Sequence, residues 1–406
     1  MKLLQINCVY KKGSTGKLAY YIHNYMLDND EQSVICYGRG EKTKDENVVK
    51  SCGEIYSKLN HLLSRFTGFM YGGCYFSTKK LIKIIKAQNP HIVHLQCING
   101  YFVNVYKLIE FLKKSRIKTV LTLHAEFMYT ANCSHSFDCE KWKKGCKGCT
   151  RYKIETESLI FNKTEKSFEK MKKAFEGFEN LTVVSVSPWL MKRAASSPIL
   201  QGKNHLTVLN GVDTNIFRPY DTTKLKKELG LENKKIVFHA TAWFSNDKNH
   251  LKGGGYVTEM AERFLTEDKN VIFLVAGEHS PLGDMPENVI VLENVTDQNK
   301  LAEFYSLADV TLLTSKRETF SMVVAESLCV GTPVVGFEAG APEEITINEF
   351  SSFVPYGDED ELFNKLKYYL NSNQKDQKII SETAKLKYDK DIMAKEYYRI
   401  YKQLNQ

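Results

Sequence analysis

Short apolar runs alternate with stretches of helical periodicity through the first half of the chain. Such runs are typical of strands buried on both faces, whereas apolar residues spaced three and four apart indicate amphipathic helices. The predicted strands are KLLQINCV, QSVICYG, PHIVHLQ, KTVLTLHA and LTVVSVS, and the predicted helices include TGKLAYYIHNYML and KSFEKMKKAFEGF. Strands that alternate with helices in this way predict a doubly wound parallel sheet.

The same pattern starts again after the sequence VLNGVDTNIFRPY. The predicted strands of the second half are KIVFHAT, VIFLVAGE, NVIVLEN, DVTLLTS and TPVVGF, and the predicted helices are YVTEMAERFL, LAEFYSLA and FSMVVAESL. A repeated alternation of strands and helices predicts a second sheet of the same kind. The fold class is therefore α/β, with two Rossmann-like domains.

Length and turn composition divide the chain between these two sheets. Its 406 residues exceed the roughly 250 to 300 at which a single core stops growing. Turn-forming residues cluster at 206–220, which is the predicted hinge. We expect domains over 1–205 and 206–385, facing each other across a cleft, because ligands of such sheets bind beyond the carboxyl ends of the strands. A C-terminal helix over 386–406 could pack back on the first domain.

Charge is distributed unevenly between the two halves. Residues 1–205 hold 33 Lys and Arg against 17 Asp and Glu, a net charge of +16, whereas residues 206–406 have a net charge of −8. A basic half is compatible with nucleic acid, an anionic membrane surface or a phosphorylated substrate. Alternatively, the excess of positive charge reflects only a lysine-rich proteome and no binding partner.

Hydropathy indicates a cytoplasmic location. No apolar run approaches the about 20 residues of a membrane-spanning helix. The N-terminal sequence MKLLQINCVYKKG lacks the pattern of a signal peptide. We therefore expect a cytoplasmic protein, with attachment to the inner face of the cell membrane left open.

Two glutamates eight positions apart lie on either side of a mostly apolar segment in SKRETFSMVVAESLCVG. The strand DVTLLTS ends just before this segment, so Glu318 is expected in a loop and Glu326 about two turns into the next helix. The amides expected at the start of that helix belong to Thr319, Phe320, Ser321 and Met322. The first amides of a helix lack internal partners and bind anions, so a diphosphate would suit this turn. The alternative is one glutamate stabilised by the helix dipole and one in solvent.

Lys252 follows the predicted strand KIVFHAT and precedes three glycines in HLKGGG. A lysine at this place would stabilise the oxygen on which negative charge accumulates as a diphosphate leaves. Away from such a site it would be an ordinary solvated lysine.

A glycine-containing loop, Gly13, Ser14, Thr15 and Gly16, is expected between the first strand and the first helix. Gly-Lys after a strand is part of the P-loop pattern, but no glycine stands five residues before Gly16, and Leu18 replaces the hydroxyl residue that holds magnesium. The sequence thus excludes P-loop ATP chemistry. The glycines would let a phosphate or sugar approach the backbone, unless they form only a tight turn.

Four of the ten cysteines cluster in CSHSFDCEKWKKGCKGC. They are Cys133, Cys139, Cys146 and Cys149, an insertion over 133–149 with the spacing C-x5-C-x6-C-x2-C. Clustered cysteines in a cytoplasmic chain favour a metal over disulfides, and four thiolates suit tetrahedral zinc. The cluster therefore predicts a structural zinc site, with no open position for chemistry.

Taken together, these motifs resemble the nucleotide-sugar glycosyltransferases of the GT-B fold, family 4, along nearly the whole chain. In that family the first carboxylate of an E-x7-E motif, matched by Glu318, binds donor-sugar hydroxyls. The second, matched by Glu326, binds the nucleotide ribose, and the amides between them cradle the diphosphate. Lys252 matches a Lys-Gly pair at the leaving diphosphate, His124 matches a histidine close to the transferred sugar, and the turn at 13–16 matches a loop near the reaction centre.

The chain departs from the family pattern at two places. The family often has an arginine shortly before its Lys-Gly pair, but HATAWFSNDKNHLKG has none, which leaves Lys248 as a candidate replacement. Many relatives have Asp after the histidine, whereas here His124 is followed by Ala125 and Glu126. The cysteine segment resembles an insertion found in a bacterial exopolysaccharide and capsule subgroup of colanic-acid type.

The resemblance implies a retaining transferase that uses no catalytic metal. It would move a hexose or N-acetylhexosamine from a UDP- or GDP-sugar to a saccharide acceptor, which we expect to be lipid-linked. The sequence DKD at 389–391 lies in a helical tail and is not interpreted as a metal-binding motif. One alternative is a sugar-nucleotide epimerase of similar fold. Another is a nucleic-acid-binding protein, although the basic half lacks the interleaved aromatic and basic residues of a known module.

Overall fold

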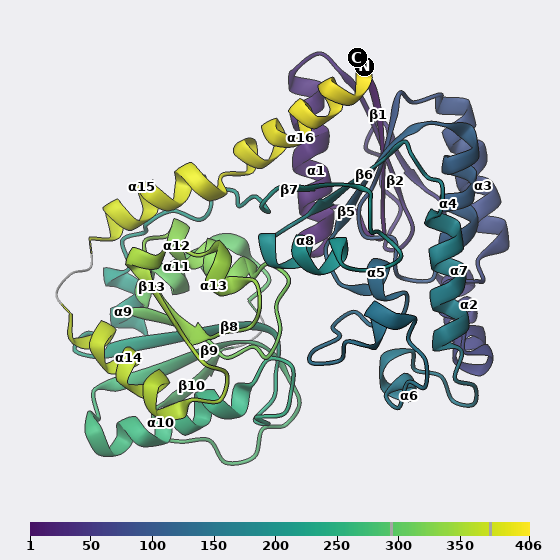
Figure 1. Ribbon diagram of the computed structural model, residues 1–406. Helices are drawn as coiled ribbons and strands as arrows, with labels where there is room; N and C mark the ends of the chain where they lie inside the picture. Colours follow the sequence, from purple (N-terminus) through teal and green to yellow (C-terminus); the bar gives the residue numbers. More distant parts are fainter. Residues whose placement is uncertain (293–294, 373–375) are drawn as a thin grey trace. The chain divides into compact units, whose positions relative to one another are not determined.

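The chain forms two compact units (Figure 1). The computed structural model describes residues 1–292, 295–372 and 376–406. Unit 1 comprises residues 1–209 together with residues 393–406, and unit 2 comprises residues 210–392. Unit 1 extends slightly past the boundary expected after residue 205, because its last strand ends at Thr207.

Unit 1 is built on a seven-stranded sheet, counted over the described residues, in which all pairings are parallel. The strand order β3-β2-β1-β4-β5-β6-β7 is doubly wound, with its switch point between β1 and β4. The strands are β1 (Lys2–Asn7), β2 (Gln32–Tyr37), β3 (Val48–Lys50), β4 (Ile92–Leu95), β5 (Lys118–Leu123), β6 (Leu181–Ser185) and β7 (Asn204–Thr207). The helices are α1 (Gly13–Asp28), α2 (Glu54–Thr67), α3 (Tyr75–Gln88), α4 (Val105–Ser115), α5 (Phe127–Thr130), η1 (Lys141–Lys144), α6 (Tyr152–Glu155), α7 (Thr164–Phe175) and α8 (Pro188–Ala195).

Helices cover both faces of this sheet (Figure 1). On one face, α1 and the C-terminal helix α16 (Lys390–Asn405) share a core with the central strands, in which Leu18, Ile22, Tyr397 and Tyr401 are buried. Helices α3, α4 and α7 lie on the other face. The helix expected over 386–406 thus begins at Lys390, and its residues from Met393 onward belong to unit 1.

Unit 2 repeats the arrangement with a six-stranded parallel sheet over its described residues. The order is β10-β9-β8-β11-β12-β13, with the switch point between β8 and β11. The strands are β8 (Lys235–Phe244), β9 (Val271–His279), β10 (Val289–Leu292), β11 (Val310–Leu313), β12 (Val334–Phe337) and β13 (Ser351–Val354). The helices are α9 (Thr223–Glu228), α10 (Gly254–Glu267), α11 (Gln298–Leu307), α12 (Met322–Cys329), α13 (Pro342–Ile345), η2 (Asn348–Phe350), α14 (Glu359–Asn371) and α15 (Gln377–Tyr388).

The core of unit 2 lies between its sheet and two helices. Val257, Met260 and Phe264 of α10 and Leu362 and Leu366 of α14 pack on the strands. Their spacing of three and four residues forms one apolar stripe on each helix.

Every apolar run interpreted as a strand forms one, and the fold prediction of two doubly wound parallel sheets is confirmed. The last two positions of NVIVLEN, 293–294, lie outside the described residues. Strands β3, β7 and β13 were missed because they are three or four residues long and only partly buried, which leaves too short an apolar run to detect. In the part of the chain that the structure describes, no helix combines the length and apolarity of a membrane span.

Candidate functional site

The loops at the switch point of unit 2 carry Lys252 and Glu318. Ligands of open parallel sheets bind beyond the carboxyl ends of such strands, here β8 and β11. Lys252 lies two residues before α10, and Glu318 lies between β11 and α12. Lys252 Nζ is 2.5 Å from Glu318 Oε1, and both side chains are partly exposed. The structure therefore joins two predicted site residues in one ion pair where the topology favours a ligand.

Backbone contacts hold Lys252 against the end of β11. Lys316 N donates a hydrogen bond to Leu251 O, and Thr314 Oγ1 donates one to Lys252 O, both at 2.8 Å. Gly253 has a φ of +61°, and a Cβ there would lie 2.2 Å from Thr314 O. Glycine is therefore required after Lys252, and this close packing fixes the lysine backbone beside Glu318.

Helix α12 begins without a side-chain cap. Ser321 is its N-cap residue, with a φ of 86° and a ψ of 94°, and the buried Ser321 hydroxyl has no hydrogen-bond partner among the described residues. A positive φ at a non-glycine residue costs about 1–3 kcal/mol and is found preferentially at functional sites. The preceding Thr319 and Phe320 are buried, and Met322 is half-buried. Because the first amides of a helix lack internal partners, this turn can hold an anion.

Glu326 is the fifth residue of α12, about one turn from its start instead of the expected two. Tyr305 Oη donates a long hydrogen bond of 3.4 Å to Glu326 Oε2. Burial, followed by the Glu326 charge, raises the pKa of Tyr305 well above its usual range. Sequence reasoning missed Tyr305, because nothing in the helix LAEFYSLA marks one apolar position as the neighbour of a carboxylate in another helix.

His124 follows β5 at the carboxyl edge of the unit 1 sheet. Its Nε2 donates to Gln96 Oε1 at 2.8 Å, and Gln96 Nε2 donates to Gln5 Oε1 at 3.2 Å. Burial lowers the pKa of His124 to about 4, so the ring is neutral near pH 7. A neutral, fixed imidazole is suited to binding a hydroxyl rather than to delivering a proton. His94, in the neighbouring strand β4, is fully buried.

The segment predicted as a loop over 13–16 is the first turn of α1. The helix begins at Gly13, and Lys12 at the N-cap position supplies no side-chain cap. A Cβ on Gly16 would lie 3.2 Å from Lys11 N, so the turn packs closely on the backbone before it. The glycines therefore serve a tight helix start, and that N-terminus favours an anion.

Glu126 is fully buried. It accepts hydrogen bonds from Tyr129 Oη at 2.7 Å and Ser136 Oγ at 2.5 Å, and Arg193 Nη2 lies 3.3 Å from its Oε2. The Arg193 guanidinium also lies 5.0 Å from the centre of the Trp142 ring. Through these contacts Glu126 connects the cysteine-rich insertion to α8.

The zinc site predicted at the cysteine cluster is not seen among the described residues. All four cysteines are free thiols, and the described residues contain no group of three or more His, Cys, Asp or Glu placed to hold a metal ion. Cys146 Sγ instead lies 3.6 Å from Thr130 O, and burial raises the pKa of this thiol to about 12. Cys133, Cys139 and Cys149 line a small cavity of about 30 Å³. Their spacing brings the thiols into one region, but it does not direct the sulfur atoms to one centre.

Lys248 is engaged by carboxylates of unit 2. Its Nζ lies 2.6 Å from Glu359 Oε1 and 3.6 Å from Glu259 Oε2, and 5.2 Å from the centre of the Tyr256 ring. These contacts account for its charge, so the geometry gives no indication that Lys248 replaces the missing arginine.

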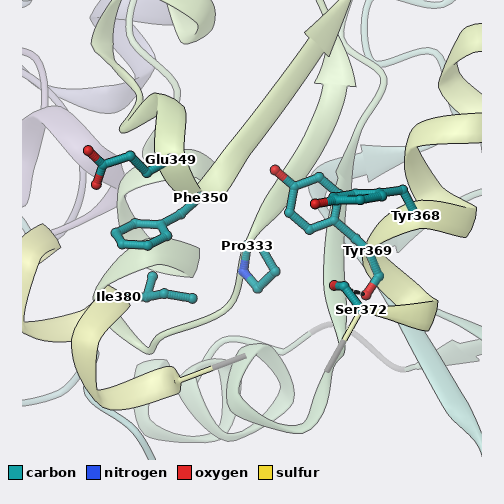
Figure 2. Close-up of a pocket in the computed structure, with 7 residues that line it drawn as sticks. All are labelled: Pro333, Glu349, Phe350, Tyr368, Tyr369, Ser372 and Ile380. Atoms are coloured by element: carbon teal, nitrogen blue, oxygen red, sulfur yellow. Dashed lines mark hydrogen bonds between the residues drawn. The ribbon is translucent and has the colours of Figure 1, made fainter. Parts of the chain in front are cut away.

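A separate cavity of about 150 Å³ lies at the opposite edge of the unit 2 sheet. Pro333 and Phe350 line it, and they directly precede β12 and β13, so the cavity is at the amino ends of the strands. Figure 2 shows the hydroxyls of Tyr368 and Tyr369 pointing into it, whereas the carboxylate of Glu349 points away. The cavity is therefore not part of the site at Lys252.

The chain is similar to known glycosyl transferases. Residues 221–386 match the family Glycosyl transferases group 1. The putative colanic acid biosynthesis glycosyl transferase WcaC of Escherichia coli K12 is 21% identical over 361 residues, covering 85% of each chain. An uncharacterized 41.2 kDa protein in the cps region of Klebsiella pneumoniae is 22% identical, covering 95% of this chain and 96% of its own.

Among solved structures, Anabaena Alr3699/HepE in complex with UDP-glucose has a similar fold. Its TM-score is 0.64 at 15% sequence identity, over 99% of this chain and 100% of that one. At this identity the match shows the fold alone, which is the two-domain GT-B arrangement.

Proposed function

We propose that the enzyme transfers a hexose or N-acetylhexosamine from a nucleotide sugar to a saccharide acceptor. The premise is that residues 221–386 match the group 1 glycosyl transferases, in a chain of the GT-B fold. The transfer retains the anomeric configuration. The donor is a UDP- or GDP-sugar, and the acceptor is a lipid-linked saccharide of bacterial surface polysaccharide at the cytoplasmic face of the membrane.

The ion pair between Lys252 and Glu318, beside the uncapped start of α12, is the observation that carries this proposal. The diphosphate of the donor binds at the α12 N-terminus, where Ser321 sits in its strained conformation. Lys252 neutralises the charge that develops as the sugar–phosphate bond breaks. Glu318 accepts hydrogen bonds from the sugar hydroxyls, and Glu326 accepts them from the ribose.

The acceptor binds to unit 1 in this proposal. His124 offers a neutral ring that holds a hydroxyl of the sugar being transferred, and the start of α1 at 13–16 offers amides to a phosphate group. The bond from the anomeric carbon to the diphosphate oxygen breaks as the bond to the acceptor oxygen forms. The acceptor proton passes to the leaving phosphate, so the enzyme works by positioning and by stabilising charge.

The biological setting of the proposal rests on two relatives. One is named for colanic acid biosynthesis, and the other is encoded in a cps region. Both cover most of this chain, including unit 1, which fits the cysteine-rich insertion that resembles the exopolysaccharide and capsule subgroup.

A donor screen tests the proposed function. The protein is incubated with UDP-hexoses, UDP-N-acetylhexosamines and GDP-mannose, with and without a lipid-linked saccharide extract, and the nucleoside diphosphate released is measured. We expect release from one donor that depends on acceptor. Conversion of a donor into its epimer without acceptor would indicate the epimerase alternative, and absence of binding to every nucleotide would contradict the proposal.

Glu326→Ala should weaken binding of the cognate nucleoside diphosphate by about 1.5–3 kcal/mol, roughly 10- to 150-fold in Kd, because it removes a charge-assisted hydrogen bond to the ribose. Titration calorimetry measures the change. Glu228→Ala in α9 is the matched control, since that carboxylate is exposed and pairs only with Lys224, at 3.6 Å, among the described residues. Equal affinity of Glu326→Ala and the control would contradict the ribose assignment.

A further inference from the structure

Helix α2 is amphipathic, but it turns its apolar side outward. The residues that it buries against unit 1 are small or polar, namely Ser57, Asn60 and Ser64. Its large apolar side chains are 46–77% exposed, and they are Ile55, Leu59, Leu62, Leu63 and Phe66. At 100° per residue these five lie on one stripe about 100° wide. A surface helix normally buries such a stripe, and among the described residues this one is uncovered.

Two neighbouring segments extend the stripe. Leu159 N donates to Arg65 O at 2.8 Å, and a Cβ on Gly68 would lie 2.5 Å from Phe161 O, so residues 159–161 run directly beside the end of α2. At the start of α3, the Phe76 ring lies 6.1 Å from the ring of Tyr56 in α2. The side chains of 159–161, Tyr75 and Phe76 are exposed as well. The α2 stripe, residues 75–76 and residues 159–161 are together called the apolar face.

Cationic side chains border the apolar face. Lys58 is exposed on α2 itself, and Lys163 Nζ lies 5.2 Å from the centre of the Phe161 ring. Lys166 and Lys170 extend their ammonium groups over Phe69, the residue after Gly68 at the end of α2, at 5.6 and 5.0 Å. Apolar side chains bordered by lysines are typical of helices that lie in the interface of a membrane.

Charge decides between the partners that an apolar face can have. Large exposed apolar patches mark protein or membrane contacts. A symmetric dimer through this face would bring two halves with a net charge of +16 each together, and like charges oppose such a contact. An anionic lipid surface instead attracts the lysines while its acyl chains accept the leucines.

We propose that the apolar face of unit 1 docks on an anionic lipid bilayer, with α2 lying in the plane of the headgroups. The biological use of this contact rests on the proposed lipid-linked acceptor, but the contact itself does not depend on that proposal. Docking would bring unit 1 to the leaflet in which such an acceptor resides.

Sedimentation with vesicles tests the inference. The full-length protein should bind vesicles of phosphatidylcholine with phosphatidylglycerol, and binding should weaken as salt rises from about 50 to about 500 mM. The double variant L59S/L63S should lower the partition coefficient by about 10- to 100-fold, because two exposed leucines no longer enter the acyl region. Their exposure in the free protein means that the thermal midpoint should not fall.

A matched control uses exposed apolar residues of unit 2. The variant I379S/L386S changes two side chains of α15 that are 53% and 79% exposed, and it should bind vesicles as the wild type does. Nucleotide binding is measured on the same preparations. A failure of the proposed glycosyltransferase function is thereby distinguished from a failure of membrane docking. The inference is overturned if L59S/L63S binds vesicles like the wild type, if the wild type binds no vesicles, or if L59S/L63S only dissociates a dimer.

Discussion

Lys252→Met should lower kcat by about 10²- to 10³-fold, or 2.7–4 kcal/mol, the range measured when one preorganised group at a developing negative charge is removed. Methionine keeps the length and apolar stem of lysine but removes its charge. The Lys252 ammonium lies 2.5 Å from Glu318, in a loop whose backbone is fixed by Thr314 and Gly253. Loss of the ammonium leaves the negative charge of the diphosphate uncompensated and removes this partner of Glu318. The KM for the donor should therefore rise as well.

Two further variants make this result specific. Lys252→Arg retains a positive charge and should recover part of kcat, although the guanidinium is a different shape from the ammonium. Lys365→Met in α14 is the control, because that lysine is exposed and pairs with Glu361 at 3.2 Å. Steady-state kinetics with the donor found in the screen provide the measurement. A Lys252→Met enzyme with kcat within about threefold of the wild type would remove Lys252 from the mechanism.

Sequence patterns predicted the fold well because buried parallel strands give the strongest signal that a chain can carry. KIVFHAT contains the buried run Ile236–Ala240 and VIFLVAGE is apolar up to its last residue, so no solvent-facing position interrupts either run. Strand β13 has only four residues with two of them half-buried, so its pattern is indistinguishable from a loop.

The sequence suggested residues for the candidate site, but it did not predict the contacts between them. Spacing along the chain indicated Glu318 and Glu326, because both belong to one strand–loop–helix segment. The pairing of Glu318 with Lys252 joins residues 66 positions apart, and only the order of β8 and β11 in the sheet brings them together. The strain at Ser321 has no sequence signal either, since serine is a common residue at helix starts.

Chain spacing does not determine where side chains point, as the cysteine cluster and helix α2 both illustrate. The spacing of the four clustered cysteines suggested tetrahedral zinc, yet Cys146 directs its sulfur to Thr130 O. Helix α2 has an apolar stripe of the kind that normally faces a core, and it carries that stripe on its exposed side. Periodicity identifies an amphipathic helix, but it does not say which neighbour, if any, covers the apolar side.

Arg193→Ala should destabilise unit 1 by about 3–5 kcal/mol, the usual cost of leaving one member of a buried ion pair without its partner. Glu126 has no exposed surface, and Arg193 brings the compensating charge to 3.3 Å from its Oε2. The substitution also removes the guanidinium that packs 5.0 Å from the ring of Trp142 and 4.9 Å from the ring of Trp189. Both indoles therefore report directly on the region that is expected to loosen.

Denaturant unfolding followed by tryptophan fluorescence measures this loss, and the double variant E126Q/R193A separates its causes. Glutamine keeps the side-chain volume of Glu126 and can still bond to Tyr129 and Ser136, but it carries no charge to be left buried. If the cost comes from the uncompensated carboxylate, E126Q should raise stability in the Arg193→Ala background but not in the wild type, which is a coupling that additive effects do not produce. Nucleotide affinity of unit 2 should be unchanged in both variants. A double variant no more stable than the single one would show that Arg193 acts through its packing on the tryptophans, and Glu126 would then be only a minor part of what holds the insertion in place.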